Sequence, residues 1–464
     1  MSIVRTLPRS PHSVGLCVVG GGAAGFYAAI ACAEAAATAP QRGQEILIVE
    51  SSSKFLHKVS ISGGGRCNVT HSPGASIESS YPRGSEIMAQ LALRHGAAHA
   101  AKWFESKGVQ LKTEEDGRVF PVSDKSESIV DCLVNTAASL GIRMLLGGRV
   151  CTLQRTSAEP TRFSLEVQTE SGEQAILCRR AILCMGSAQK RSVQKLLRDA
   201  GANLRPLAPS LFSVLTGSCD LAGLQGLSVP DAALELVGSQ HLPRIRGPVL
   251  ITHEGLSGPA ILRLSAWAAF AFQEAGYRAR LRVNWVPSLT LDDAVEAILA
   301  VPLGRGSRPP VRRKPVGDVS PWPGLLPARL WGRLLQKLEA EESNSKFRPF
   351  VRQYRVDGLP LAQWPWAVFG FPDAGRCLAV ALWNHLTALE VEVRGRRTNK
   401  EEFVTAGGVD VRELDWDRME LRSCPGLHFA GEIVDIDGIT GGFNFQGCWS
   451  SGYAAGVAAA DAFD

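Results

Sequence analysis

Residues 18–25 read VVGGGAAG, and this stretch decides the fold of the N-terminal part of the chain. Gly20, Gly22 and Gly25 satisfy the pattern G-x-G-x-x-G, directly after an apolar run (15–19) that is expected to be a strand. In such a turn the first glycine permits a tight bend and the second leaves room for a diphosphate. The third lets the following helix pack closely on the strand. The pattern therefore predicts a dinucleotide site whose phosphates face a helix N-terminus.

A second strand is expected at 45–49, and a helix of small residues (24–37) lies between the two strands. Strand, helix and strand in this order predict a right-handed βαβ unit. Glu50 ends the second strand, where a carboxylate can accept hydrogen bonds from both ribose hydroxyls of an adenosine half. The same charge disfavours a 2′-phosphate, so NADP is not expected at this site.

The sequence ISGGGRCNVTH (61–71) follows this unit. Three consecutive glycines indicate an unusual backbone or the close approach of a flat ligand. Arg66 and Asn68 bring donors beside these glycines, and Lys58 precedes them. We expect this segment to form one wall of a cofactor site.

The C-terminal part contains a third glycine-rich stretch, GLHFAGEIVDIDGITGGFNFQGCWSSGYAAG (426–456). Its first residues predict a buried strand, after which Glu432 is expected to hold ribityl hydroxyls. Gly441 and Gly442 would let backbone approach an isoalloxazine ring. A final helix is expected at roughly 449–462, and its N–H groups would favour the negative charge of a reduced flavin.

The remaining pattern predicts an α/β nucleotide domain that is interrupted by an insert. Helices are expected at 86–108, 124–141, 188–201, 289–301 and 326–342, and strands at 162–168 and 174–183. Short apolar runs separated by Gly and Pro after residue 205 are typical of an antiparallel β module. The Arg- and Pro-rich segment 304–324 is interpreted as an exposed linker. The expected domains are 14–204 and 396–464 for the nucleotide-binding domain, and 205–395 for an insert that combines this β module with a helical part (about 287–352).

Composition excludes several classes of protein. The 50 Lys and Arg against 45 Asp and Glu give a net charge of only +5, so no nucleic-acid partner is expected. The 11 cysteines form no CxxC pair and no zinc-ligand spacing, which indicates no metal and a reducing, cytoplasmic compartment. The sequence predicts no membrane span, because no uninterrupted apolar run reaches about 18 residues.

Together, GGGAAG, ISGGGRCN and AGE-x-x-D-x-x-G-x-T-G-G-x-N resemble the BaiN/RdsA-like NAD(P)/FAD-dependent oxidoreductases, also described as YhiN-like or aminoacetone-oxidase-family flavoproteins. THEGLSGPAILRLS (252–265) extends the resemblance into the insert. The resemblance implies FAD and a glutathione-reductase-like FAD-binding Rossmann domain interrupted by an inserted β-barrel and helical subdomain. Relatives usually carry ATGG where this chain reads CMGS (184–187), a departure that leaves the local contacts of this segment open.

The cofactor-binding residues expected from these motifs form one set. They are Gly20, Gly22, Ala23, Ala24, Gly25, Glu50, Ser51, Lys58, Ser62, Gly63, Gly64, Gly65, Arg66, Cys67, Asn68, Gly186, Gly431, Glu432, Asp435, Gly441, Gly442 and Asn444. The chain has no second G-x-G-x-x-G after a strand and no CxxxxC redox pair. Any NAD(P)H is therefore expected to bind only transiently.

Two residues are candidates for acid–base work near the flavin. His253 would serve if the insert covers the flavin, and Cys67 would serve if Arg66 lowers its pKa. The leading hypothesis is hydride transfer at flavin N5 to or from a small organic substrate bound between the nucleotide domain and the insert. Reduction of an enone C=C bond and oxidation of an amine both stay open.

Two other functions stay open as well. The single Rossmann site would also suit an NAD-linked dehydrogenase, and the Arg- and Pro-rich segment is the one feature that favours an RNA-associated flavoprotein. The substrate, the direction of electron flow and the oligomeric state do not follow from the sequence.

Overall fold

The computed structural model describes residues 3–7, 11–37, 45–156, 162–217, 221–300, 318–340, 372–397 and 404–461. The chain divides into two compact units, which are taken separately below. Unit 1 comprises Met1–Ser210 and Asn399–Asp464, and unit 2 comprises Leu211–Thr398. The sequence-based boundaries lie near 204 and 396. Most of the Arg- and Pro-rich segment 304–324 lies outside the described residues.

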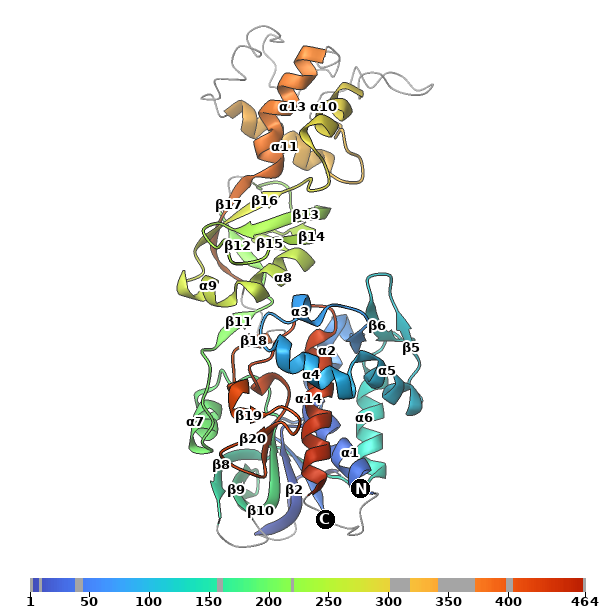
Figure 1. Ribbon diagram of the computed structural model, residues 1–464, viewed down its shortest axis with the longest axis vertical. Coiled ribbons are helices and arrows are strands. Elements are labelled where there is room, and N and C mark those ends of the chain that lie inside the picture. Colours follow the sequence, from blue (N-terminus) through green and yellow to red (C-terminus); the bar gives the residue numbers. More distant parts are fainter. Residues whose placement is uncertain are drawn as a thin grey trace. The chain divides into compact units, whose positions relative to one another are not determined.

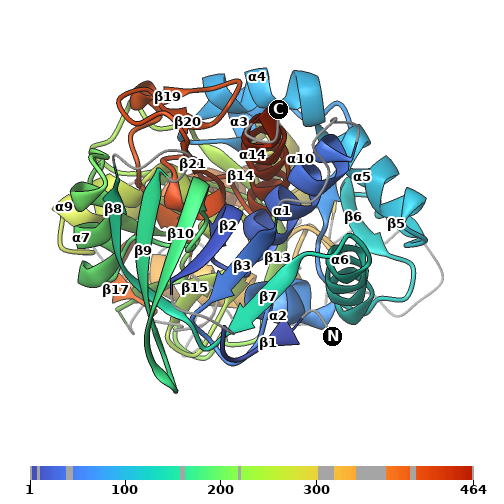
Figure 2. The same ribbon diagram turned by 90° about the horizontal axis from the view of Figure 1, so that it is seen from below.

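The core of unit 1 is a twisted sheet whose central strands run parallel (Figure 2). Strand β2 lies between β3 and β10, with Val18 opposite both Ile48 and Ile182. These apolar runs are almost completely buried, as expected for parallel strands covered on both faces. In spatial order the strands are β1 (Ile3–Val4), β7 (Arg143–Leu146), β3 (Ile46–Glu50), β2 (His12–Val19), β10 (Gly172–Leu183), β21 (Leu427–Phe429), β20 (Glu420–Leu421) and β19 (Leu414–Asp415). Strand β9 (Phe163–Thr169) joins β8 (Arg149–Arg155) to β10.

Two helices made of small residues pack side by side against this sheet (Figures 1 and 2). They are α1 (Ala23–Ala36) and α14 (Phe443–Ala460). A Cβ atom on Gly456 would lie 2.2 Å from the carbonyl oxygen of Ala28, and one on Gly452 would lie 2.8 Å from that of Ala24. Glycine at these two positions is what lets the helices approach so closely. The N-terminal and C-terminal motifs therefore share one layer of the fold.

The structure corrects the sequence-based limits of two helices. Helix α14 begins at Phe443, not near Trp449, because Gly441 and Gly442 at positive φ form the turn directly before it. The helix expected at 86–108 is two helices, because Gly96 interrupts it.

The other elements of unit 1 flank the sheet. The helices are α2 (His57–Gly65), α3 (Ile77–Ser80), α4 (Ser85–His95), α5 (Ala97–Ser106), α6 (Glu127–Ser139) and α7 (Arg191–Asp199), with 3-10 turns η6 (Val411–Glu413) and η7 (Gly431–Ile433). The minor strands are β4 (Thr70–His71), β5 (Leu111–Thr113), β6 (Arg118–Pro121), β11 (Ala208–Ser210) and β18 (Val404–Ala406).

Unit 2 contains a closed six-stranded barrel, in the spatial order β12-β15-β14-β13-β16-β17. Its strands are β12 (Val214–Thr216), β13 (Ser228–Leu236), β14 (Ile245–Ile251), β15 (Gly255–Ser257), β16 (Ala279–Asn284) and β17 (Leu389–Arg396). The helices among the described residues of this unit are α8 (Pro259–Trp267), α9 (Ala269–Glu274), α10 (Leu291–Ala300), α11 (Ala328–Ala340) and α13 (Pro372–Thr387). Helices α8 and α9 fall outside the sequence-based predictions.

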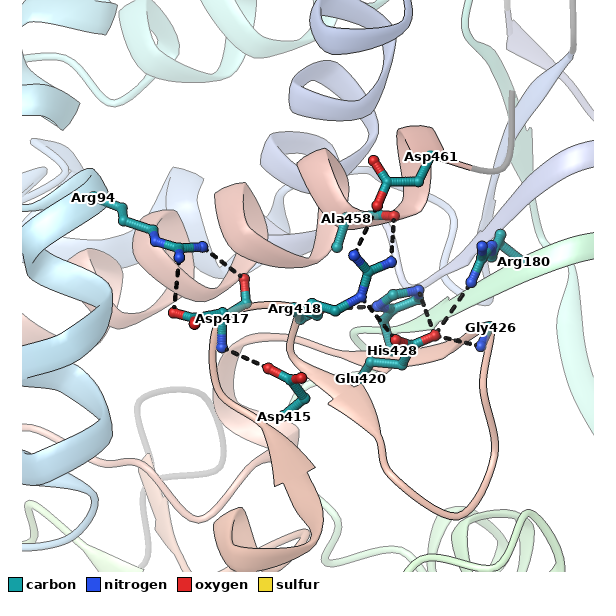
Figure 3. A network of polar contacts seen from close by, with 10 residues as sticks. All are labelled: Arg94, Arg180, Asp415, Asp417, Arg418, Glu420, Gly426, His428, Ala458 and Asp461. Carbon is teal, nitrogen blue, oxygen red and sulfur yellow. Dashed lines mark hydrogen bonds and ion pairs between the residues drawn. The ribbon is translucent and has the colours of Figure 1, made fainter. Parts of the chain in front are cut away.

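A network of charged side chains fixes the C-terminal end of α14 to the sheet (Figure 3). The guanidinium of Arg418 donates to Glu420, and it pairs with Asp461 at 2.7 Å. Glu420 also accepts from the backbone N–H of Gly426 and pairs with Arg180 at 3.2 Å. His428 is fully buried beside Glu420, and burial lowers the pKa of its imidazole. Removing one partner would leave buried charge unbalanced, so we assign this network a structural role.

No described helix is long and apolar enough to cross a membrane. The part of the chain that the structure describes also holds no group of three or more His, Cys, Asp and Glu side chains arranged for a metal ion.

Candidate functional site

Of the three glycines of the G-x-G-x-x-G pattern, the fold itself requires Gly20 and Gly25 but not Gly22. A Cβ atom on Gly20, whose φ is +112°, would lie 2.3 Å from the carbonyl oxygen of Cys184. One on Gly25 would lie 1.9 Å from the carbonyl oxygen of Gly20. A Cβ atom on Gly22 would meet no protein atom within 4 Å. Open space therefore borders the start of α1.

The first turn of α1 has no side-chain cap. Gly22 is the N-cap residue and has no side chain, and no acidic residue lies in the first turn. Ala23 and Ala24, which follow it, are small. The first turn of α1 and the positive end of its helix dipole thus border a space in which an anion can bind. Room, donors and charge at this point fit the diphosphate of a dinucleotide.

Glu50 lies at the end of β3, next to the glycine turn. One carboxylate oxygen accepts from the N–H of Gly21 at 2.7 Å, and the other accepts from the N–H of Ser52 at 2.7 Å. The hydroxyl of Ser51 reaches the same carboxylate at 3.4 Å. Backbone donors thus hold a half-exposed carboxylate beside the cradle, where an adenosine ribose would require acceptors.

The SGGGRCN segment has the unusual backbone that its three glycines predict. Ser62 is extended and interrupts α2, while Gly63, Gly64 and Gly65 have φ values of +57°, +70° and +83°. A Cβ atom on Gly64 or Gly65 would meet no protein atom within 4 Å. The segment therefore exposes bare peptide that a flat ligand could approach.

Arg66 and Cys67 do not form the reactive pair that the sequence suggested. The guanidinium of Arg66 donates to Glu114 and Asp124 and lies 3.9 Å from the centre of the Phe120 ring. Cys67 is completely buried, and burial raises the pKa of its thiol to about 12. The expectation that Arg66 lowers this pKa is therefore wrong, because Arg66 is engaged by two carboxylates and desolvation dominates at the thiol.

Asn68 connects the SGGGRCN segment to the C-terminal glycines. The side-chain amide of Asn68 has hydrogen-bond partners on both its atoms in one orientation. In that orientation the nitrogen donates to the carbonyl oxygens of Thr70 (2.9 Å) and Val119 (3.2 Å). The amide oxygen accepts from the N–H of Gly442 at 3.0 Å. A Cβ atom on Gly442 would lie 2.4 Å from the carbonyl oxygen of Thr70. The two motifs, more than 370 residues apart, thus form one wall.

The polar residues of the C-terminal loop have mixed roles. Asn444 closes the loop, because its amide accepts from the N–H of Gly438 and donates to the carbonyl oxygen of Gly438. Asp437 is fully buried in an ion pair with Arg83, so its role is structural. Asp435 has a buried carboxylate oxygen without a donor among the described residues, and burial raises the pKa of this carboxyl. This oxygen is closed off within the described residues, so the expected contact of Asp435 with the cofactor stays a prediction.

Lys58 and Glu432 form an ion pair of 2.6 Å at the edge of the cradle. Gly186, with φ of +73°, lies close by, since a Cβ atom there would be 3.6 Å from a carboxylate oxygen of Glu432. Gly431 packs on α1, because its Cβ atom would lie 2.7 Å from the Cβ atom of Ala24. Gly186 and the C-terminal loop thus lie beside the N-terminal segments that are expected to bind the cofactor.

His253 lies on the exposed loop between β14 and β15 in unit 2. No hydrogen bond fixes its ring within the described residues, and its role stays a prediction.

Sequence reasoning missed His71. Its Nδ1 lies 3.0 Å from the carbonyl oxygen of Gly441, and its ring stacks on Phe443 with 4.7 Å between the centroids. The histidine is half-buried beside the two glycines expected at the ring. The signal was present, because His71 ends the motif ISGGGRCNVTH and strand alternation orients it with Val69 toward one face.

Comparison with known proteins adds three findings. The HI0933-like protein Rossmann domain family matches residues 14–458. A 3-dehydro-bile acid delta(4,6)-reductase of Clostridium scindens is 26% identical over 452 residues, covering 96% of this chain and 98% of that protein. A ribosomal RNA dihydrouridine synthase of Escherichia coli is 27% identical over 454 residues, covering 94% and 96%.

Among solved structures, a 3-ketosteroid-Δ4-(5α)-dehydrogenase from Rhodococcus jostii shares 15% identity and a TM-score of 0.47, with 98% of each chain covered. The family match spans the glycine turn, the insert and the C-terminal loop. The chain therefore belongs to the HI0933-like protein Rossmann domain family and is an oxidoreductase with a Rossmann-type nucleotide-binding fold.

Proposed function

We propose that this oxidoreductase binds FAD and reduces a C=C bond that is conjugated with a carbonyl group. The observation that carries the proposal is the open space at Gly22, bordered by the uncapped start of α1 and by the carboxylate of Glu50. An adenosine diphosphate half needs this combination of room, N–H donors and ribose acceptor. The open backbone at Gly64 and Gly65 supports a flat ring beyond it.

Each proposed contact uses a group that the chain already holds in place. The backbone at Gly22–Gly25 would bind the diphosphate, and Glu50 would bind the adenosine ribose. Glu432 would accept from ribityl hydroxyls. Bound FAD would supply a hydride at N5. NAD(P)H, as a transient reductant, would restore the reduced flavin.

The names of the two relatives favour this reaction class. A 3-dehydro-bile acid with 4,6-double bonds and a uridine base both contain a C=C bond conjugated with a carbonyl. Hydride adds to the carbon remote from the carbonyl, and a proton adds to the adjacent carbon. The chain needs one proton donor for this step. We retain His253 as a candidate and add His71, because it lies beside Gly441.

The distribution of charge favours RNA as a second class of substrate. Leu211–Thr398 contains 22 Lys and Arg against 16 Asp and Glu, whereas the rest of the chain contains 28 against 29. The positive charge of the protein is therefore concentrated in the sequence of unit 2, where it would attract phosphate. This modifies the expectation, drawn from the overall charge, that no nucleic acid is involved.

One experiment tests the reaction class and the substrate together. The purified protein is reduced anaerobically with NADH or NADPH and then mixed with a 3-oxo-4-ene steroid, a uridine-containing RNA or a small amine. We expect bleaching by a nicotinamide and recovery of the yellow colour with a conjugated acceptor, whose mass increases by two hydrogens. A flavin that stays oxidised under both nicotinamides but is reduced by the amine would contradict C=C reduction and favour amine oxidation.

A further inference from the structure

Lys58 and Glu432 form an ion pair between two segments that are 374 residues apart in the sequence. The carboxylate is the better fixed partner: its side chain is 16% exposed, and its second oxygen accepts from the N–H of Thr405 at 3.2 Å. The ammonium of Lys58 is 56% exposed and pairs with this one carboxylate among the described residues. The pair thus has one fixed anion and one movable cation.

Two polar side chains help to hold the carboxylate through Thr405. The hydroxyl of Ser187 lies 2.6 Å from that of Thr405. Gln189 also donates to the Thr405 hydroxyl, at 3.0 Å. Thr405 is almost completely buried, and its N–H is the donor to Glu432. Ser187 and Gln189 thus help to fix the segment whose N–H holds Glu432.

The ion pair lies next to the proposed diphosphate site. The N–H of Leu56 donates to the carbonyl oxygen of Gly21 at 2.8 Å, which holds the segment leading to Lys58 against the glycine turn. Glu432 follows Gly431, which packs directly on Ala24 in the first turn of α1. A diphosphate at this turn would therefore bring two negative charges close to both members of the pair.

The charges of the pair conflict once the diphosphate is present. An ammonium on a flexible stem attracts phosphate from any direction, because it has three donors and no fixed plane. The Glu432 carboxylate repels phosphate and competes for the same ammonium. An exposed ion pair contributes little to stability, so opening it is cheap. The pair can therefore exchange partners without cost to the fold.

We propose that Lys58 and Glu432 form an electrostatic latch across the cofactor site. Without cofactor they neutralise each other. When FAD binds, Lys58 turns to the diphosphate, and the freed Glu432 accepts from a ribityl hydroxyl. This inference rests on the proposed binding of FAD, and both residues act as positioning residues for it.

The latch predicts effects of opposite sign on two ligands. ADP has the diphosphate but no ribityl chain, so Glu432→Gln should release Lys58 and tighten ADP binding about two- to fivefold. The same change should weaken FAD, because an acceptor for the ribityl hydroxyl is impaired. Lys58→Gln should weaken both ligands, by about tenfold. AMP, which lacks the second phosphate, should respond less to either change.

The test is calorimetric titration of the flavin-free full-length protein with ADP, AMP and FAD. The variants are Glu432→Gln, Lys58→Gln, the double variant and Lys102→Gln, a matched control on the exposed face of α5. Gln at position 432 keeps an acceptor for Thr405, and urea unfolding checks each variant. In the Lys58→Gln background, Glu432→Gln should lose most of its gain toward ADP, because no ammonium is left to release.

The outcomes separate the latch from the proposed function. If Glu432→Gln tightened ADP binding equally with and without Lys58, Glu432 would simply repel the diphosphate, and the latch would be overturned. Unchanged ADP binding in Glu432→Gln, with normal FAD and ADP binding by the unaltered protein, would overturn the latch alone. Failure of the unaltered protein to bind either FAD or ADP would overturn the proposed cofactor and the latch with it.

Discussion

Replacing Gly22 by alanine should separate the stability of the fold from the binding of the cofactor. The added Cβ atom would meet no protein atom within 4 Å, and the φ of −93° suits alanine. Alanine is a poorer N-cap than glycine, so we expect the free energy of unfolding to fall by only about 0.5–1 kcal/mol. The same methyl group would occupy space that a phosphate needs.

The expected loss of FAD affinity follows from the hydrogen bonds that would be disturbed. Two N–H donors to a phosphate are worth about 1.5–3 kcal/mol each. Their loss would weaken FAD binding by about 3–6 kcal/mol, or roughly a hundredfold to ten-thousandfold. Urea unfolding of the flavin-free protein and quenching of flavin fluorescence measure the two quantities.

Gly25→Ala is the contrasting variant. Its Cβ atom would lie 1.9 Å from the carbonyl oxygen of Gly20, so the backbone must shift and the fold itself should be destabilised. If Gly22→Ala were stable and kept full affinity for FAD, the diphosphate could not lie at this turn and the proposed site would be refuted.

Three further predictions follow from buried groups of unit 1. Asp437→Asn should lower the free energy of unfolding by about 3–5 kcal/mol in urea, because it removes the buried carboxylate that pairs with the largely buried Arg83; a change below 1 kcal/mol would contradict this. Burial lowers the pKa of His95 to about 4, so between pH 6.5 and pH 4 the imidazole is protonated in the unfolded chain but not in the folded one. The free energy of unfolding should therefore fall by about 3 kcal/mol over this range because of His95, and His95→Gln should remove this part of the pH dependence. Cys67→Ala should keep its pH–rate profile and most of its turnover, whereas a large loss of turnover in a folded variant would restore Cys67 as a catalytic residue.

The βαβ unit was predictable because strong local signals agreed with the tertiary structure. An apolar run, three spaced glycines and a terminal acid specify β2, α1 and β3 with errors of a few residues. The start of α14 was not predictable in the same way. Phe443 and Asn444 are weak helix formers, and their helical state depends on the turn at Gly441–Gly442 and on packing against α1.

The side-chain partners at the site depend on long-range contacts that periodicity does not encode. The sequence could not show that Glu114 and Asp124 engage Arg66, or that burial keeps Cys67 protonated. It also could not show that Asn68 reaches Gly442 or that Lys58 reaches Glu432. In each case the partner lies in a different segment of unit 1.

The identity of the molecule that the purified protein carries tests the proposed cofactor site most directly. The measurement is release of the bound cofactor by denaturation, its identification by chromatography and absorbance, and its molar ratio to the chain. We predict FAD, bound one per chain, or taken up to that ratio by the flavin-free protein. A folded, colourless protein that carries NAD or takes up no flavin would contradict the proposal that this chain binds FAD.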